Sequence, residues 1–403
     1  MITLRLIVKN FRSIKSQELN LAPITLIYGP NGTGKSSLLY ALLTLKNIIL
    51  NPSRHVIEFF NLKFLNLGDL KEVIFDHNTS NELELGIIFD KEGFQLDYRI
   101  SILENVGVFS VTFSGPERLK GHRKLRVSFP YPVNKKEEYH IIINDQQVRL
   151  YWTGLTWEAE TVPPDISEKV QSILEILNSP IELLKQIGFI PLMRGFNKPH
   201  YSISTTVSPL SVTFSDEEVA SLLANDRFLE YTLSSHLNEI FGKDLRIRVK
   251  PGTTLFTIDT LDKSTALGVS IINEGFGINQ LVYLLTLSLY KDFKIVCIEE
   301  PEIHLHPSAV RKLAQILTKI AKEQGKIFII STHSEPLVVA FLSLVANGKL
   351  SPSDLACYLA VKDGKISIFR PQKVNEKGQI EGGLRSFMEG ELEEVATFLD
   401  VRE

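Results

Sequence analysis

The sequence predicts an α/β fold with a mixed sheet, divided by an inserted lobe that is rich in β-strands and also carries helices. At 403 residues the chain is longer than one ordinary domain. Strands alternate with helices at both ends of the chain, whereas short alternating runs fill its middle. The predicted boundaries are residues 1–70 and 265–403 for the two parts of the α/β domain, and 71–264 for the lobe.

The first part begins with two apolar runs and a helical pattern. Ile2–Val8 and Ile24–Tyr28 are apolar and partly β-branched, which predicts strands. From Lys35 to Leu50 leucines recur at helical spacing, so a helix is expected directly after the second strand.

The middle of the chain has a different pattern. Short alternating runs separated by Gly, Asn, Asp and Pro predict antiparallel strands and hairpins. These runs are Leu83–Phe89, Phe94–Leu103, Val106–Phe113 and Tyr139–Ile143. Helices are then predicted at Ile166–Leu177 and Glu217–Phe241.

The last part returns to alternation, which argues for a parallel sheet. The predicted strands are Lys294–Ile298 and Ile327–Ile330, and the predicted helices are Ser308–Lys322 and Pro336–Ala346. The tail is expected to complete the sheet with strands at Leu355–Val361 and Lys365–Phe369, followed by a helix from about Gly390.

Composition excludes several classes of protein. With 44 Lys+Arg against 47 Asp+Glu, any nucleic-acid contact must come from a local patch. The two cysteines, Cys297 and Cys357, cannot build a disulfide framework, which favours a reducing compartment. Apolar stretches such as Leu281–Tyr290 fall short of the roughly 20 residues that a membrane helix needs. We therefore expect a soluble, cytoplasmic protein without membrane contact.

The strongest chemical motif is Gly29-Pro30-Asn31-Gly32-Thr33-Gly34-Lys35-Ser36, a match to G-x-x-x-x-G-K-S between a strand and a helix. Glycines let backbone N–H groups turn toward phosphate oxygens, and the helix N-terminus favours negative charge. The lysine is predicted to neutralise phosphate charge and the serine to hold Mg²⁺. The nucleotide-binding residues predicted here are Asn31, Gly32, Thr33, Gly34, Lys35, Ser36 and Ser37.

Two acids follow a buried-type strand, at the end where α/β sites lie. Glu299 is predicted to hold Mg²⁺ together with Ser36, and Glu300 to orient or deprotonate the attacking water. His333 follows the next strand. A lone histidine after an apolar strand is often a core residue with its hydrogen bonds satisfied. The position of His333 favours instead a sensor of the γ-phosphate.

Five motifs in a fixed order resemble the ABC-type ATPase superfamily in its RecF/SMC/OLD-like branch, in particular its stand-alone ATPases without a long coiled coil. They are Lys9–Ile14, Gly29–Ser36, Asn273–Gly277, Glu299–Pro307 and Ser331–Ser334. The resemblance implies the fold of a P-loop ATPase head that uses Mg-ATP.

The resemblance also implies a head-to-tail homodimer around ATP. Asn273 and Gly275 would contact the partner's ATP, and Pro301–His306 would form the D-loop across the interface. Arg12 and Ser13 would lie near the nucleotide.

The motifs depart from the superfamily in three places. Glu299 stands where an aspartate is usual, and Asn273 stands where the signature serine is usual. No Q-loop glutamine is evident, and Asp76 and His77 are the candidates in the matching region.

Three features keep alternative interpretations. His304 and His306 suit a metal site by spacing, although the D-loop assignment is favoured. Arg194, in the Pro191–Gly195 motif, is either functional or an ordinary arginine. A basic cluster in the inserted lobe is either a phosphate-tracking stripe or a charged hairpin edge, and the edge is slightly favoured because aromatic residues are not interleaved. The cluster comprises Arg118, Lys120, His122, Arg123, Lys124 and Arg126.

Two functions are predicted. The first is an ATP-hydrolysing enzyme of DNA maintenance, repair or anti-invader defence. The second is an ATP-gated interaction module that controls a partner effector and uses slow hydrolysis as a timer. A transporter ATPase fits the diverged signature less well. Nuclease activity is not expected, because only 56 residues follow Asn347.

Overall fold

The computed structural model describes residues 3–91, 93–114, 120–143, 146–203, 213–381 and 383. The chain divides into two units. Unit 1 comprises Met1–Leu21 and Ser37–Ile187, and unit 2 comprises Ala22–Ser36 and Gly188–Glu403. The domain boundaries predicted from the sequence, after residues 70 and 264, do not coincide with the limits of these two units. They stay a prediction. The helix predicted from Gly390 lies outside the described residues.

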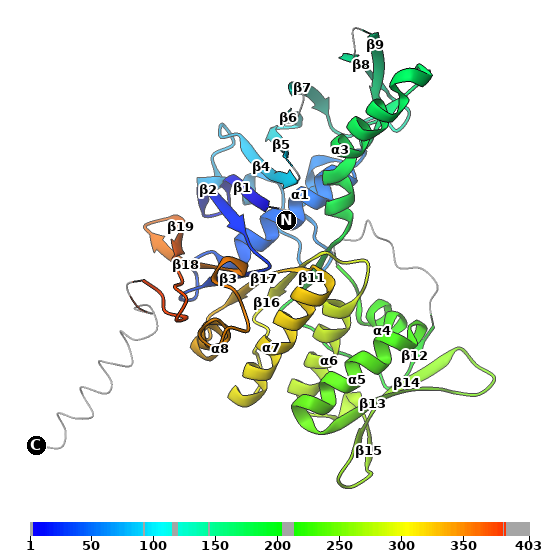
Figure 1. Ribbon diagram of the computed structural model, residues 1–403, viewed down its shortest axis with the longest axis vertical. Coiled ribbons are helices and arrows are strands. Elements are labelled where there is room, and N and C mark those ends of the chain that lie inside the picture. The colour runs from blue at the N-terminus through cyan, green and yellow to red at the C-terminus, as the bar shows by residue number, and fades with distance from the viewer. Residues whose placement is uncertain are drawn as a thin grey trace, which may run out of the picture. The chain divides into compact units, whose positions relative to one another are not determined.

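Unit 1 is built on a six-stranded antiparallel sheet in the order β2-β1-β4-β5-β6-β7 (Figure 1). The strands are β1 (Thr3–Phe11), β2 (Ile14–Leu21), β4 (Leu83–Lys91), β5 (Phe94–Leu103), β6 (Val106–Ser114) and β7 (Lys120–Ser128). Burial alternates along β5 and β6, as expected when one sheet face is packed and the other is not. The hairpins predicted from alternating runs are confirmed.

The rest of unit 1 is a smaller sheet and several helices. The sheet has the order β10-β9-β8, with β8 (Glu137–Ile143), β9 (Gln146–Trp152) and β10 (Trp157–Ala159). The α-helices are α1 (Lys35–Leu50), α2 (Leu70–Val73) and α3 (Ser167–Lys185), and the 3₁₀ turns are η1 (Val56–Phe60), η2 (Phe75–His77) and η4 (Pro164–Ile166). The bounds predicted for α1 are confirmed, and its first two residues fall in unit 2.

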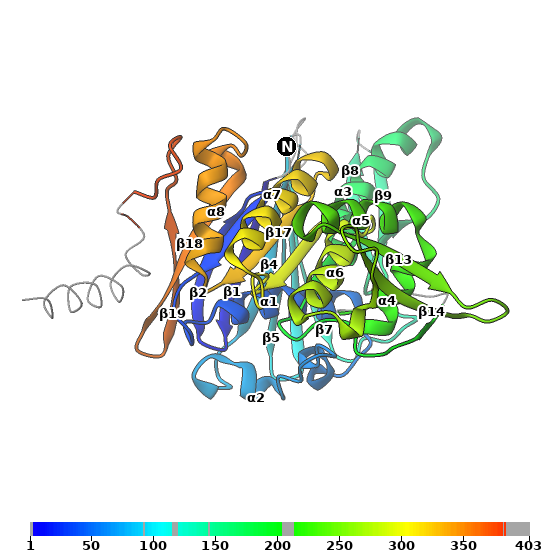
Figure 2. The ribbon, with the colours of Figure 1, turned by 90° about the horizontal axis from the view of Figure 1, so that it is seen from below.

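Unit 2 contains the mixed sheet, in the order β11-β16-β17-β3-β18-β19. The strands are β3 (Ile24–Tyr28), β11 (Ile187–Ile190), β16 (Ile295–Glu299), β17 (Ile327–Thr332), β18 (Leu355–Asp363) and β19 (Ile366–Gln372). From β16 to β18 neighbours are parallel, and β19 is antiparallel to β18. Figure 2 shows β18 and β19 at the end of this sheet, so the prediction that the tail completes the sheet is confirmed.

Helices and a small antiparallel sheet surround these strands. The helices are α4 (Asp216–Asn225), α5 (Arg227–Phe241), α6 (Phe276–Leu289), α7 (Pro307–Gln324) and α8 (Glu335–Ala346), with the 3₁₀ turns η5 (Ile271–Asn273) and η6 (Pro352–Asp354). The small sheet has the order β12-β14-β13, with β15 on β14. Its strands are β12 (Tyr201–Ser202), β13 (Lys243–Val249), β14 (Leu255–Asp262) and β15 (Gly268–Ser270).

One predicted helix is wrong. Glu217–Phe241 was expected as a single helix, but α4 ends at Asn225 and α5 begins at Arg227. Asp226 causes the break, because its carboxylate accepts hydrogen bonds from the N–H groups of the second and third residues of α5. That is the geometry of a helix N-cap.

The core of unit 2 comprises buried side chains of the central strands, of helices α4 to α8 and of strands β13 and β14. β3 and β16 are buried along their whole length, as continuous apolar runs in a covered parallel sheet should be. Cys297 and Cys357 are both buried. Across the described part of the chain, every helix is too short or too polar to cross a bilayer.

Candidate functional site

Three loops leave the unit 2 sheet at the carboxyl ends of neighbouring parallel strands. The loop at 29–36 follows β3, Glu299 ends β16 with Glu300 directly after it, and His333 follows β17. The register sets Glu299 beside Ser331 of β17, so the two strands end together. The sequence motifs therefore meet at one edge of the sheet, where α/β folds bind ligands.

The loop before α1 depends on glycine. Gly29, Gly32 and Gly34 have φ values of 144°, 76° and 90°, a region that other residues rarely adopt. At Gly29 a Cβ would also lie 2.3 Å from the carbonyl oxygen of Ala360 in β18. The loop can therefore turn its N–H groups inward at the start of a 16-residue helix, which is the arrangement that binds phosphate.

Lys35 is held under this loop with 7% of its surface exposed. Its Nζ donates to the carbonyl oxygens of Gly29 and Pro30, at 2.8 and 2.9 Å. Burial lowers the pKa of Lys35, and the nearby carboxylates of Glu300 and Glu302 act in the opposite direction. The lysine is thus in electrostatic range of the acids at the end of β16, which are more than 260 positions away in the sequence.

The other predicted loop residues differ in exposure. Asn31 and Gly32 are exposed at the tip, and Ser36 is half-buried at the start of α1. Thr33 is buried, and its hydroxyl donates to a main-chain carbonyl inside the loop at 2.8 Å. Ser37 is buried and belongs to unit 1.

The acid pair is held by the strand ends. Glu299 is 4% exposed, and its Oε2 accepts a long hydrogen bond from the Leu192 N–H at 3.4 Å. Glu300 has a positive φ of 42° and donates its N–H to the Ser331 carbonyl. Its Oε2 lies 2.6 Å from Nδ1 of His333 and accepts the His333 N–H at 3.0 Å. The two residues predicted to be catalytic, Glu300 and His333, are therefore in direct contact.

Arg194 clamps the chain at this turn. Its guanidinium donates to the carbonyl oxygens of Pro191, Glu299 and Glu300 at 3.0, 2.7 and 2.8 Å. Burial lowers the pKa of Arg194 to about 10, while the neighbouring carboxylates favour its charged form. The arginine thus positions the acid pair through its main chain, one of the two interpretations that the sequence left open.

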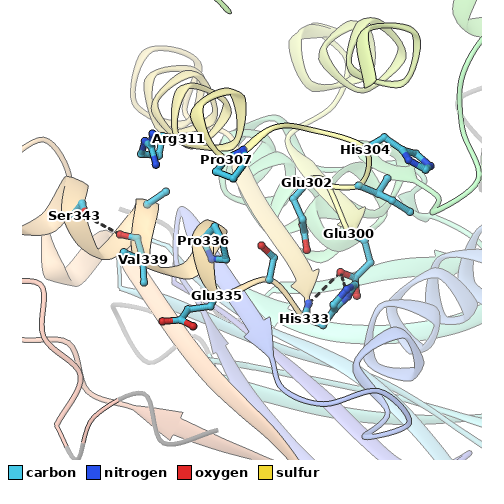
Figure 3. Close-up of a pocket in the computed structure, with 13 residues that line it drawn as sticks. Glu300, Glu302, His304, Pro307, Arg311, His333, Glu335, Pro336, Val339 and Ser343 are labelled. Atoms are coloured by element: carbon cyan, nitrogen blue, oxygen red, sulfur yellow. Dashed lines mark hydrogen bonds and ion pairs between the residues drawn. The ribbon is translucent and has the colours of Figure 1, made fainter. Parts of the chain in front are cut away.

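Glu302 is a site residue that sequence reasoning missed, since it was placed only within the D-loop segment. Its Oε1 accepts a hydrogen bond from the Thr332 hydroxyl at 2.5 Å. Burial, together with the proximity of Glu300, raises the pKa of Glu302 to about 8. The E-x-E spacing after a buried strand is the signal that could have identified it. Figure 3 shows its carboxylate directed toward Glu300 and His333.

In the signature segment, Asn273–Gly277, Glu274 is anchored and the residues on either side of it are exposed. Glu274 is held by Lys243 at 2.7 Å and by the hydroxyl of Thr260. Asn273 and Gly275 on either side are exposed. A Cβ on Gly275 would meet nothing within 4 Å, so packing inside the described chain does not require glycine there. The segment therefore presents an open surface.

The two histidines of the D-loop segment have separate roles. A Cβ on Gly277 would lie 2.5 Å from the carbonyl oxygen of His304, whose ring lies 5.8 Å from that of Phe276. Nδ1 of His306 accepts the Ser308 N–H and caps α7. His304 thus packs against the signature segment, and His306 begins a helix.

Arg12 and Ser13 lie in unit 1, in the turn between β1 and β2. Arg12 has a φ of 52° and donates its N–H to the carbonyl of Val73. Asp76 and His77 are in the same unit, both with positive φ. Their contacts with a nucleotide stay predictions.

The basic cluster falls on β7, at the end of the unit 1 sheet. Lys124 and Arg126 are exposed and alternate with buried Leu125 and Val127. Arg118 and the side chains at 120–123 lie outside the described part. A charged edge strand is the interpretation that the sequence favoured, and these positions agree with it.

The chain is similar to known proteins in sequence. A model of the family described as "AAA domain, putative AbiEii toxin, Type IV TA system" matches residues 24–340. An OLD nuclease of Thermus scotoductus is 24% identical over 351 residues, which are 82% of this chain. The chain spans 58% of the length of that relative.

Solved structures resemble the chain at low sequence identity. An SMC head bound to the C-winged helix domain of ScpA aligns with a TM-score of 0.50 and 13% identity, over 91% of this chain and 97% of that one. An SMC head with an extended coiled coil, from Pyrococcus furiosus, aligns with a TM-score of 0.48 and 13% identity over the whole of both chains. The first likeness bears on the fold alone, and with the family match it confirms the predicted fold class.

Proposed function

We propose that this chain, which belongs to the family of AAA domains described as putative AbiEii toxins, binds Mg-ATP and hydrolyses it to ADP and phosphate. The resemblance to ABC-type ATPases of the RecF/SMC/OLD-like branch is confirmed. One observation carries the proposal of hydrolysis. A glycine-rich loop with a buried lysine meets, at one sheet edge, a glutamate that contacts a histidine at 2.6 Å.

The residues at this edge fit a Mg-bound triphosphate. Backbone N–H groups of the loop and the Lys35 ammonium suit the phosphate oxygens. The Ser36 hydroxyl and the buried Glu299 carboxylate suit the ion, and the weak 3.4 Å contact leaves Glu299 able to bind it. Mg-ATP when bound supplies an electrophilic γ-phosphate whose charge the ion partly neutralises.

The chemical step assigned to the chain's own residues is the acceptance of a proton from the attacking water. Glu300 is placed to take the proton of an attacking water, because its carboxylate lies at the strand end beside the phosphate loop. His333 fixes that carboxylate through both its ring and its N–H. Arg194 fixes the backbone beneath it. The side chain of Glu299 is one methylene longer than that of the usual aspartate, which changes the position of the ion and with it the expected rate of hydrolysis.

Head-to-tail dimerisation is the second part of the proposal. Asn273 and Gly275 lie on an open surface of unit 2, and Phe276 beside them is 75% exposed. Such a surface suits contact with the nucleotide of a second copy. The role of Arg12 and Ser13 beside the nucleotide is proposed on the same resemblance.

We place the ATPase in DNA maintenance or anti-invader defence. The support is the OLD nuclease relative, which is 24% identical over 82% of this chain. The test is ATP turnover with and without single- and double-stranded DNA at two salt concentrations. Stimulation that weakens with salt supports a DNA role. Slow turnover indifferent to DNA, with an effector that copurifies, supports the gated module instead.

Two variants test the chemistry. Lys35→Ala is expected to abolish ATP binding, because it removes the cation under the phosphate loop. Glu300→Gln is expected to keep ATP binding, block turnover and accumulate an ATP-bound dimer, measured by light scattering. Turnover of the Glu300→Gln protein at the parent rate would show that another group activates the water.

Nuclease activity belongs to the relative by its name, and we propose none for this chain. Incubation of the pure protein with supercoiled plasmid and Mg²⁺ or Mn²⁺ is the check. Metal-dependent cleavage of the plasmid by the pure protein would overturn this part of the proposal.

A further inference from the structure

Three side chains at the end of β16 and β17 have the spacing of metal ligands. One ligand atom each from Glu300, Glu302 and His333 can be chosen so that all lie within 4.8 Å of one another. Two carboxylates and an imidazole meet there from two adjacent loops (Figure 3). The loop at 29–36 and Glu299, which are assigned to Mg-ATP, are not part of this group.

Glu302 supplies a second and independent observation. It is 9% exposed, and its Oε2 is buried without a hydrogen-bond partner within the described residues. Thr332 satisfies only the other oxygen. A buried carboxylate oxygen without a partner is costly, and few are found in folded proteins. This oxygen therefore points to a ligand at the cluster.

The two neighbouring cations are in electrostatic range of the acids but donate their hydrogen bonds elsewhere. Lys35 donates to the carbonyls of Gly29 and Pro30, and the hydrogen bonds of Arg194 also go to main-chain carbonyls.

The distances suit a small divalent ion. Ligands about 2.1 Å from a metal lie up to about 4.2 Å apart across it, so the 4.8 Å limit requires shifts of less than 1 Å. Two carboxylates with one imidazole favour an ion that takes both oxygen and nitrogen ligands, such as Mn²⁺ or Zn²⁺, over Ca²⁺. We propose that Glu300, Glu302 and His333 form a binding site for a divalent transition-metal ion, with Mn²⁺ as the reference ligand.

The site is reached from a cavity of about 810 Å³. The cluster lines this cavity together with residues from the starts of α7 and α8, among them Pro307, Arg311, Glu335 and Pro336. Water entering from the cavity would complete the coordination of the ion. The exposed ring of His333 allows the ion to bind without opening the core.

Occupancy has a consequence that rests on the proposed function. An ion bound to the Glu300 carboxylate takes the place of the His333 contact and removes the electron pair that would accept a proton from water. Mn²⁺ is therefore expected to inhibit ATP turnover, although Mn²⁺ alone often replaces Mg²⁺ on nucleotides.

Binding is tested on the full chain without nucleotide, by titration with Mn²⁺ and detection of free Mn²⁺ by electron paramagnetic resonance. The parent is expected to bind one ion at the cluster. Glu302→Gln is expected to weaken binding at least about tenfold, since it removes one of three protein ligands. The control Glu335→Gln makes the same charge change in the same cavity and should bind like the parent.

Two further variants keep the test decisive. His333→Gln replaces an exposed side chain, so it reports on the site even if Glu302→Gln does not fold. Ser36→Ala should retain binding, because the phosphate loop is not part of the site. Equal affinity of the parent, Glu302→Gln and His333→Gln proteins overturns the proposal, and so does loss of binding in Ser36→Ala.

Inhibition is measured separately, in saturating Mg-ATP with added Mn²⁺, on the parent and on Glu335→Gln. Loss of turnover at the Mn²⁺ concentration that fills the site supports the regulatory consequence. If Mn²⁺ binds but turnover is unchanged, the proposed metal site stands and the proposed inhibition is rejected. A parent that does not hydrolyse ATP rejects the proposed function, while the nucleotide-free titration still decides the metal site.

Discussion

Replacing Arg194 is the sharpest test of how the acid pair is positioned. Arg194→Met keeps an unbranched side chain but removes three hydrogen bonds, to the carbonyls of Pro191, Glu299 and Glu300. Hydrogen bonds from a charged donor contribute about 1.5–3 kcal/mol each. Because water can reach part of this half-buried position, we expect a loss of at least about 3 kcal/mol in the free energy of unfolding.

The expected shift follows from the size of unit 2. A domain of about 150–250 residues loses roughly 2–4 °C in Tm per kcal/mol, so Arg194→Met should melt about 6–12 °C below the parent. Turnover should fall further than stability at 25 °C explains, because Glu300 has a positive φ and loses the anchor of its carbonyl.

The assay can assign the damage to unit 2. Both tryptophans, Trp152 and Trp157, lie in unit 1, so their emission follows that unit, whereas far-UV circular dichroism follows both. Arg194→Lys keeps the charge but not the planar fork, and is expected to recover part of the Tm and little turnover. Arg311→Met, at an exposed position, is the control. A Tm for Arg194→Met within 1 °C of the parent, with parent turnover, would refute the clamp.

Three further predictions concern unit 2. Gly277→Ala should lower the Tm, because its Cβ would lie 2.5 Å from a carbonyl oxygen, whereas Gly275→Ala should leave the Tm unchanged and weaken the ATP-bound dimer; calorimetry and light scattering check the pair. Asn279→Ala should lower stability by several kcal/mol, since this buried amide makes three main-chain hydrogen bonds, and denaturant unfolding measures the loss. Lys326 is buried with its pKa lowered to about 7, below the unfolded value of about 10.4. The unfolded state therefore binds one more proton between these values, stability should rise there by about 1.4 kcal/mol per pH unit, and Lys326→Met should remove that slope in unfolding measured from pH 7.5 to 9.5.

Local signals predicted the parts of the fold that local physics decides. The strands β3 and β16 are runs buried on both faces, and their sequences are continuously apolar. The helix at Lys35–Leu50 was found because glycines precede it and leucines recur along it. A single capping residue was overlooked at Asp226, although an acid followed by a helical pattern is a recognised helix start.

The remaining site residues have no local signal. Besides the carbonyl of Pro191 in its own segment, Arg194 binds carbonyls of residues 105 and 106 positions later in the chain, and no periodicity or spacing reveals that. Glu302 lies in a loop, and its hydrogen-bond donor Thr332 comes from the next strand. Sequence patterns identify groups that react, whereas the groups that hold them become visible only when separate loops meet.

The two cations at the sheet edge, Lys35 and Arg194, are expected to differ in how far their replacement damages the fold. Lys35 and Arg194 are each fixed by carbonyl oxygens, so neither depends on a carboxylate for its position. Removing Lys35 should therefore abolish phosphate binding and cost the fold less than removing Arg194, because it breaks two hydrogen bonds, of which the one to Pro30 lies at an exposed position of the loop. Removing Arg194 should damage the fold first, because the carbonyls it binds lie under the acid pair. If both variants lost nucleotide binding with an unchanged Tm, the two cations would share one role at the phosphate.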